Sequence, residues 1–140
     1  MIISRTTVSA ELGLTLVVPE RGSVPLLASL SYSADDPYAV RMAFHVGTDE
    51  PVEWTFAREL LTTGLTCPAG DGDVQVWPAP PGRREVLNIA LSSPFGQARF
   101  EASASATSGF LYLTYGIIAA GREDEFIDVD NELGQLLRRA

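Results

Sequence analysis

The residue types that carry most enzyme chemistry are scarce in this chain. It has one histidine, His45, and one cysteine, Cys67. His45 lies within an alternating run of apolar and polar residues, which predicts a strand-face side chain with a structural contact. Cys67 precedes a proline in a predicted loop, where no helix N-terminus would activate its thiol. The chain also lacks the Gly-x-Ser-x-Gly turn that presents a nucleophilic serine. We therefore expect no nucleophilic hydrolysis.

Acidic residues do not complete a ligand site either. Asp71 and Asp73 are spaced like the first ligands of a calcium loop, but the remaining ligands of that loop are missing. The glycines beside them lack the third position of a dinucleotide fingerprint. One histidine with one cysteine cannot make a transition-metal site. Glu123 and Glu125 lie in an acidic run, where nothing predicts the buried cleft that an acid–base pair needs. The sequence therefore predicts no enzyme, no metal and no cofactor, and it favours a binding function.

Composition indicates one globular domain over residues 1–140. Of the 140 residues, 46% are hydrophobic and 20% are charged. This length is typical of a single domain that can bury its own core. Eighteen acidic residues against ten basic ones give a net charge of −8. Because phosphate contacts dominate nucleic-acid affinity, this balance argues against nucleic-acid binding.

The same composition predicts a cytoplasmic protein. A single cysteine cannot form an intrachain disulfide, which fits a reducing compartment. The N-terminal residues lack the charged and long apolar regions of a signal peptide. The longest apolar stretch, at 110–120, is shorter than the ~20 residues that span a bilayer, so we expect no direct membrane insertion.

Apolar residues alternate with polar ones in several successive runs. A period of two is typical of half-buried strands, and short links between runs predict an antiparallel meander. The first four runs cover residues 8–18, 26–32, 40–46 and 52–56. The period then changes, and we expect a short helix over 57–63 that ends at Gly64. Three more strands are predicted at 73–77, 86–91 and 97–102. The β-rich part thus extends over about 5–102.

The C-terminal part, about 104–138, is predicted to be helical. Ser103 or Ser105 can cap a helix that continues to about Ala119 and ends before Gly121. A last helix would follow an aspartate cap and present three leucines on one face. Antiparallel strand sets followed by helices make an α+β protein.

The first of these helices is apolar on more than one side. Its candidate interface residues are Phe110, Tyr112, Leu113, Tyr115, Ile117 and Ile118. A helix that is apolar all round is normally covered on more than one side. The sheets can cover one side, so either a partner or another copy of the chain, or else the last helix at 130–138, must cover the other. The residues alone leave both alternatives open.

Together these segments resemble the SsgA-like proteins, a sporulation and cell-division family of actinomycetes. The likeness rests mainly on Val-Glu-Trp-Thr-Phe-Ala-Arg-Glu-Leu-Leu at 52–61 and Gly-Asp-Val-Gln-Val-Trp-Pro at 72–78, and it spans nearly the whole chain. Further matching positions are 36–40, Phe44, His45, 90–94, Gly96, Phe110, Leu111, Thr114, Gly121, Glu123 and 128–133. The resemblance implies two packed antiparallel four-stranded sheets with C-terminal helices, like the Whirly nucleic-acid-binding fold. It also implies a trimer assembled through those helices.

The resemblance further implies a non-enzymatic regulator of sporulation-specific cell division. Such proteins help to localise or promote assembly of the tubulin-like protein FtsZ at septation sites. The expected partners are FtsZ, other SsgA-like paralogues and further copies of the chain, at the division septum. The chain departs from many relatives at Tyr112 and Leu113, where they carry basic residues, and at Ala119 and Ala120, where they carry prolines. This departure suggests a divergent paralogue or an altered interface.

The alternative function is single-stranded nucleic-acid binding, which the Whirly likeness suggests. It needs exposed aromatic rings over a basic groove. Tyr32, Tyr38 and Trp77 could supply the rings, but the only adjacent basic pairs are at 83–84 and 138–139. A deep polar pocket with convergent carboxylates would instead indicate an enzyme or a small-ligand barrel.

Overall fold

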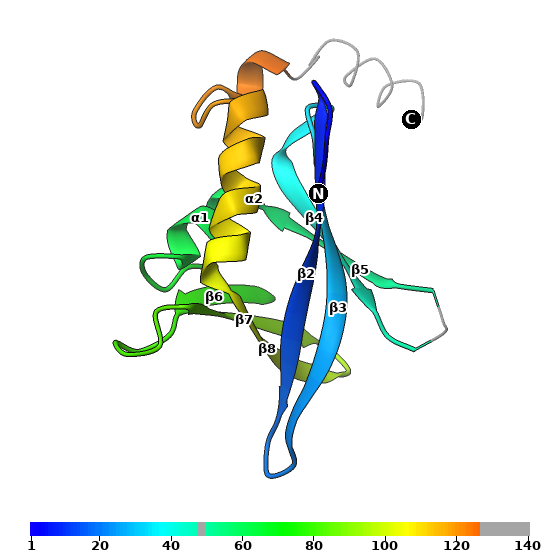
Figure 1. The fold of residues 1–140 in the computed structure, drawn as a ribbon, viewed down its shortest axis with the longest axis vertical. Helices are drawn as coiled ribbons and strands as arrows, with labels where there is room; N and C mark the ends of the chain where they lie inside the picture. The colour runs from blue at the N-terminus through cyan, green and yellow to red at the C-terminus, as the bar shows by residue number, and fades with distance from the viewer. Residues whose placement is uncertain (48–49, 127–140) are drawn as a thin grey trace.

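Eight antiparallel strands form a single curled sheet in the computed structural model, which describes residues 1–47 and 50–126. The strands are β1 (Ile2–Ile3), β2 (Thr7–Val18), β3 (Gly22–Ser33), β4 (Asp36–His45), β5 (Val52–Ala57), β6 (Val74–Pro78), β7 (Val86–Ser93) and β8 (Gly96–Ser103). Their order across the sheet is β5-β4-β3-β2-β8-β7-β6, with β1 paired to β2 (Figure 1). The helices are α1 (Arg58–Gly64), α2 (Ala104–Ile117) and the 3-10 helix η1 (Glu123–Phe126). The predicted α+β class is confirmed.

Strand β2 joins the two halves of the sheet. It pairs with β3 along its whole length, and at residues 14–17 its other edge pairs with β8. The expected two packed four-stranded sheets are instead one sheet of eight strands, because this ladder continues the hydrogen bonding from one half into the other. The sheet curls into an open half-barrel (Figure 1). The core is also continuous, since the rings of Phe44 on β4 and Phe100 on β8 stack with centroids 4.9 Å apart.

Burial confirms the predicted alternation of the strands. On β2, β3 and β4 the apolar set faces the concave side, where it is removed from water, while the residues between are more exposed. The buried set on these strands is Val8, Leu12, Leu14, Ala28, Leu30, Tyr32, Val40, Met42 and Phe44. The pattern weakens near the turn that joins β4 to β5, where Val46 and Val52 are 49% and 51% exposed. That end of the concave face is therefore open.

The short helix α1 lies within one residue of its predicted range, but the role predicted for Gly64 is wrong. Gly64 is the last residue of the helix and is buried, and the helix cap is Leu65. A Cβ atom at Gly64 would lie 2.3 Å from Cγ1 of Val76 on β6. Glycine is therefore needed here because α1 packs closely on β6, and not because the chain must turn.

Helix α2 begins as predicted and ends earlier. The Ser103 hydroxyl accepts a hydrogen bond from the backbone N–H of Ala106 at 3.1 Å, so the predicted cap is confirmed. The helix ends at Ile117, because the next residue, Ile118, is extended with φ −135° and ψ 118°. Gly121, with φ 82°, serves the turn that follows. The last predicted helix, capped at Asp128 or Asp130, lies outside the described residues.

Among the described residues, no helix combines the length and the apolar character that crossing a bilayer requires.

Candidate functional site

The six residues predicted as an interface on α2 have very different exposures. The side chains of Phe110 and Ile118 lie in the core of the chain itself, at 0% and 1% exposed, so they are not available to a partner. Leu113, Tyr115 and Ile117 are half-buried and pack against that core. Tyr112 is 78% exposed. Helix α2 stands beside β2 and next to α1 (Figure 1), and its buried side faces these elements.

The outward side of α2 is made of small residues around one tyrosine. Its exposed members are Ser105, Ala106, Ser108, Gly109, Tyr112 and Gly116. We call this set the small-residue face. The whole helix has no charged residue, although the chain has a net charge of −8. A Cβ atom at Gly109 or Gly116 would meet nothing within 4 Å. A backbone with such short side chains can be approached closely by another surface.

A buried arginine fixes the position of α2. Arg58, the first residue of α1, is 1% exposed. Its guanidinium lies between two aromatic rings, 4.8 Å from the centroid of Tyr32 and 4.1 Å from that of Tyr115. Cations are attracted to the faces of aromatic rings, and the attraction is strongest where water is excluded. Tyr32 comes from β3 and Tyr115 from α2, so one side chain connects three elements.

The same guanidinium satisfies the end of α2. Nη1 of Arg58 donates to the carbonyl oxygens of Thr114 at 3.2 Å and Ile118 at 2.8 Å. Nη2 donates to Oε1 of Glu123 in η1 at 2.8 Å. Carbonyls at a helix C-terminus lack helical partners and carry partial negative charge, which favours a cation there. The hydrogen bond from Arg58 also holds the pKa of the Glu123 carboxyl below its usual range. We call Arg58 and these partners the arginine clamp.

Sequence reasoning did not find the arginine clamp. An arginine at the start of a short helix is usually solvated, and long charged side chains are seldom fully buried without a partner. The partners of Arg58 lie 56 to 65 residues further along the chain. An additional hydrogen bond of 2.6 Å joins the hydroxyls of Thr62 on α1 and Tyr115 on α2. These contacts position α2, and with it the small-residue face.

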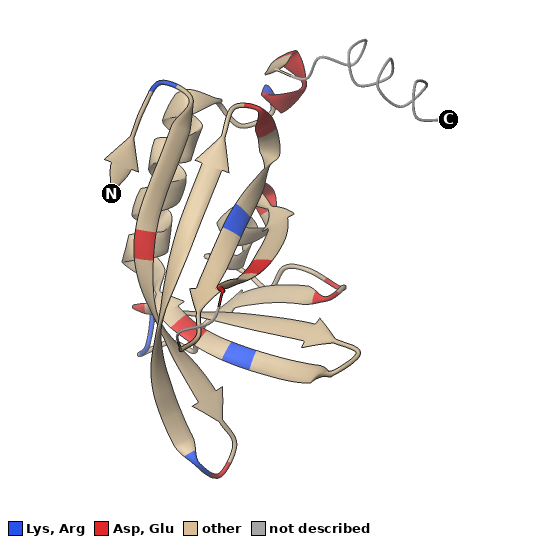
Figure 2. Cartoon of the chain, turned by 90° about the vertical axis from the view of Figure 1, so that its right-hand side faces the viewer, with Lys and Arg blue, Asp and Glu red and all other residues tan. Residues whose placement is uncertain are grey.

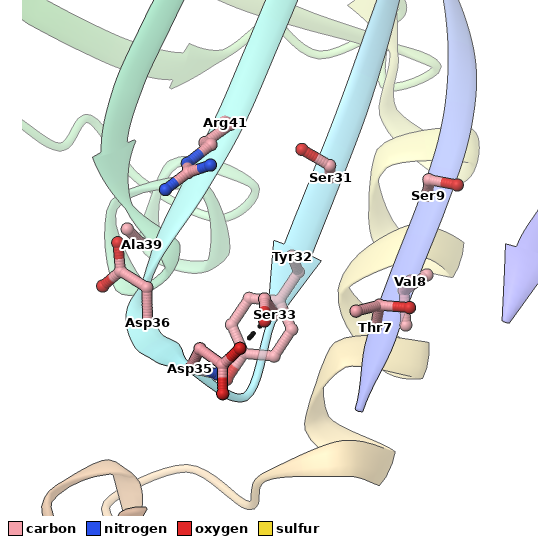
Figure 3. Close-up of a pocket in the computed structure, with 10 residues that line it drawn as sticks. All are labelled: Thr7, Val8, Ser9, Ser31, Tyr32, Ser33, Asp35, Asp36, Ala39 and Arg41. Atoms are coloured by element: carbon pink, nitrogen blue, oxygen red, sulfur yellow. Dashed lines mark hydrogen bonds between the residues drawn. The ribbon is translucent and has the colours of Figure 1, made fainter. Parts of the chain in front are cut away.

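A polar hollow of about 340 Å³ lies over the first parts of β2 and β4 and the last part of β3. Figure 3 shows Ser9, Ser31 and Arg41 along neighbouring strands, with Asp35 and Asp36 at the turn between β3 and β4. Both aspartates are exposed, so neither has the buried setting that acid–base catalysis by a carboxyl pair requires. The described lining of the hollow thus lacks the buried, convergent carboxylates that would indicate an enzyme.

The isolated candidate residues take structural or exposed positions. Nε2 of His45 lies 2.8 Å from the hydroxyl of Ser29, which confirms the predicted strand-face contact. Cys67 is exposed in the loop after α1. Asp71 and Asp73 are exposed in the turn before β6. Within residues 1–47 and 50–126, no group of three or more His, Cys, Asp or Glu side chains could hold a metal ion.

The aromatic residues predicted for nucleic-acid stacking do not form one platform. Tyr32 is 3% exposed, and its hydroxyl donates to the carbonyl of Pro37 at 2.8 Å. Burial raises the pKa of this phenol, and the charge of Arg58 opposes that rise. Tyr38 is exposed, while Trp77 is half-buried. On the side of the molecule that Figure 2 shows, the basic segments are separated from one another. The expected role of Tyr32 in stacking is therefore wrong.

One family model and two similar proteins match the sequence of this chain. The model of the Streptomyces sporulation and cell division protein SsgA matches residues 26–123. The sporulation-specific cell division protein SsgB of Thermobifida fusca is 56% identical over 137 residues, which cover 98% of this chain and 99% of that protein. The SsgB protein of Streptomyces coelicolor is 49% identical over 132 residues, which cover 94% and 96% of the two chains.

Solved structures extend the similarity to three dimensions. The crystal structure of an SsgA-like sporulation-specific cell division protein from Thermobifida fusca matches with a TM-score of 0.83 at 56% identity, over 96% of this chain and 98% of that one. A second structure has a TM-score of 0.82 at 49% identity and covers 87% of this chain and 96% of that one. Its subject is mutations in SsgB that correlate to longitudinal cell division during sporulation of Streptomyces coelicolor. With this extent of matching sequence and structure, the chain belongs to the SsgA family of sporulation and cell division proteins.

Proposed function

We propose that this protein is a non-enzymatic regulator of sporulation-specific cell division that acts as a homotrimeric scaffold. The general role is supported by the relatives, which are named as sporulation-specific cell division proteins. The assembly is supported by one observation, the uncharged small-residue face of α2. An exposed surface of a strongly acidic chain normally carries charge, and its absence over a whole helix favours contact with another surface.

The small-residue face suits a helix-mediated assembly. The absence of side chains at Gly109 and Gly116 allows close approach of a neighbouring backbone, and Tyr112 supplies a large side chain that can enter the partner. Tyrosine is among the residues enriched at interface centres. The arginine clamp supports the face from behind, because it fixes the last turn of α2 to α1 and η1.

The likeness of this fold to the Whirly nucleic-acid-binding fold stays a prediction.

The proposed partner is FtsZ at septation sites, with recruitment to the division septum. A trimer would offer three copies of a weak site to a polymer, and linked sites raise the overall avidity without any new contact. The chain has a net charge of −8, and we expect FtsZ to be acidic as well. Long-range charge steering then does not help association, so contact should rest on apolar or local polar groups.

The decisive experiment measures molar mass in solution by light scattering. The wild type should have about three times the 15.1 kDa of one chain. Tyr112→Glu places a charge in the small-residue face and should reduce the mass to that of a monomer. Leu113→Glu is less suitable, because Leu113 packs against the core of its own chain. Tyr38→Glu is the matched control, since Tyr38 is also exposed but lies on β4.

Co-sedimentation with FtsZ polymers then tests the scaffold mechanism. The wild type and Tyr38→Glu should sediment with the polymer, and the monomeric Tyr112→Glu variant should bind much more weakly. If the wild type is a monomer in solution, linked sites cannot raise its avidity for the FtsZ polymer. A trimer that shows no binding to FtsZ would keep the assembly and overturn the proposed partner.

A further inference from the structure

A groove of about 370 Å³ lies at the open end of the half-barrel. Residues that line it come from both halves of the sheet and include Val46, Val52, Trp54, Leu91, Phe95 and Phe100. None of the described residues that line the groove carries a charge. Phe95, at the tip of the β7–β8 hairpin, is 100% exposed, and Val52 at the start of β5 is 51% exposed. Adjoining apolar side chains with this exposure mark an interaction surface on a soluble protein.

One side of the groove is an open sheet edge. Within residues 1–47 and 50–126, strand β5 is the last strand of the sheet and pairs only with β4. No backbone hydrogen bond from another described segment covers its outer edge. Strand β6, at the opposite end, is protected, because Ala69 and Val76 exchange backbone hydrogen bonds of 2.8 and 2.9 Å. An unpaired strand edge can accept an added strand through its backbone groups.

The residues of β5 define what such a strand must contain. Val52 and Trp54 point into the groove, so Glu53 between them faces the opposite side of the sheet. Glu53 is exposed and makes no ion pair with a described residue. An added strand would place alternate side chains in the groove and the remaining ones beside Glu53. Opposite charges on neighbouring strands attract, and like charges repel.

We infer that the β5 edge and the adjoining groove bind an extended peptide in which apolar residues alternate with basic ones. The apolar side chains fill the space between Trp54 and Phe95, and a lysine or arginine lies beside Glu53. The net charge of −8 also favours the approach of a cationic segment. This site is separate from the small-residue face, so the inference stands whether or not α2 forms a trimer.

A labelled synthetic heptapeptide that alternates valine and lysine is the first probe, and fluorescence anisotropy with the full chain measures its affinity. Phe95→Ser should weaken binding by about tenfold, because it removes one wall of the groove. Since Phe95 is fully exposed, this variant should fold normally. Tyr112→Glu, on the other surface, should bind the peptide as the wild type does.

A charge swap gives a sharper test. Glu53→Lys should weaken binding of the valine–lysine peptide by at least about threefold. The same variant should gain binding to a valine–glutamate peptide of the same length. Glu11→Lys makes the same change of net charge at an exposed position on β2, and it should not show this reversal.

Three outcomes would overturn the inference. The first is no binding of the valine–lysine peptide at millimolar concentration. The second is binding that Phe95→Ser and Glu53→Lys leave unchanged. The third is that no peptide binds, the chain associates with itself, and Phe95→Ser abolishes this self-association. A second copy of the chain would then occupy the groove.

Discussion

The guanidinium of Arg58 donates a 2.8 Å hydrogen bond to the carboxylate of Glu123, which lies 65 residues further along the chain. The arginine side chain is 1% exposed and the glutamate side chain 15%. Between them in sequence lies all of α2, whose final carbonyls accept two more hydrogen bonds from the same guanidinium. This pair thus closes the described C-terminal part of the chain onto α1.

We predict that Arg58→Met lowers the free energy of unfolding by about 3 kcal/mol. Glu123 would lose its cation and the carbonyl of Ile118 would lose its donor, while the carbonyl of Thr114 would keep the backbone N–H of Ile118. Arg58→Lys should also lower the free energy of unfolding, because one ammonium group cannot reproduce the planar fork of the guanidinium. Urea titration measures both effects. Arg41→Met, at an exposed position, should change stability by less than about 0.5 kcal/mol. An equal loss in the Arg41 and Arg58 variants would contradict a special role for the clamp.

Stability should depend on pH through Glu123. Its pKa is lowered in the folded state, mainly by the hydrogen bond from Arg58. The carboxylate therefore stabilises the fold fully at pH values above its unfolded pKa of about 4.5, and this stabilisation disappears as the pH falls through the folded pKa. Unfolding of wild type and Glu123→Gln, compared from neutral to acidic pH, should show a difference that shrinks below that value.

Glu125→Gln is the matched control for this pH series. The hydrogen bond from Arg122 also lowers the pKa of Glu125, but both side chains are largely exposed. Surface pairs of this kind contribute little to stability. A pH dependence that Glu125→Gln removes and Glu123→Gln leaves in place would contradict the assignment.

Gly64→Ala should destabilise the protein by about 2 kcal/mol, although alanine is the better helix former. The added methyl group would collide with the side chain of Val76. Val76→Ala in the same chain should restore part of the loss, which makes the two changes strongly non-additive. Thermal or urea unfolding measures the cycle. Gly13→Ala is the control, because a Cβ there meets nothing within 4 Å.

Binding to FtsZ should depend weakly on salt. If contact rests on apolar or local polar groups, added salt screens little of the interaction. Co-sedimentation at low and high ionic strength measures the effect. A steep loss of binding with added salt would show that charged groups dominate the contact, against the proposed mechanism.

The sequence by itself determined the elements and the family. Alternation at 8–18 and 40–46 predicted strands whose concave faces are buried, because a period of two places every second side chain on one side of a sheet. Ser103 or Ser105 was predicted as a helix cap, because a serine hydroxyl can satisfy a free N–H at a helix start, and Ser103 is the cap. Such signals are local, and the residues that cause them lie within a few positions of one another.

Only the tertiary structure decided which distant residues meet. The ladder between β2 and β8 makes one curled sheet, and its partners lie more than 80 positions apart, beyond the reach of any periodic pattern. Phe110 and Tyr112 are both aromatic residues of one helix, yet the side chain of Phe110 is buried and that of Tyr112 is 78% exposed. Arg58 is charged, and it is buried because acceptors from α2 and η1 surround it. Burial is a property of the assembled elements, since each side chain is covered by residues that folding brings to it.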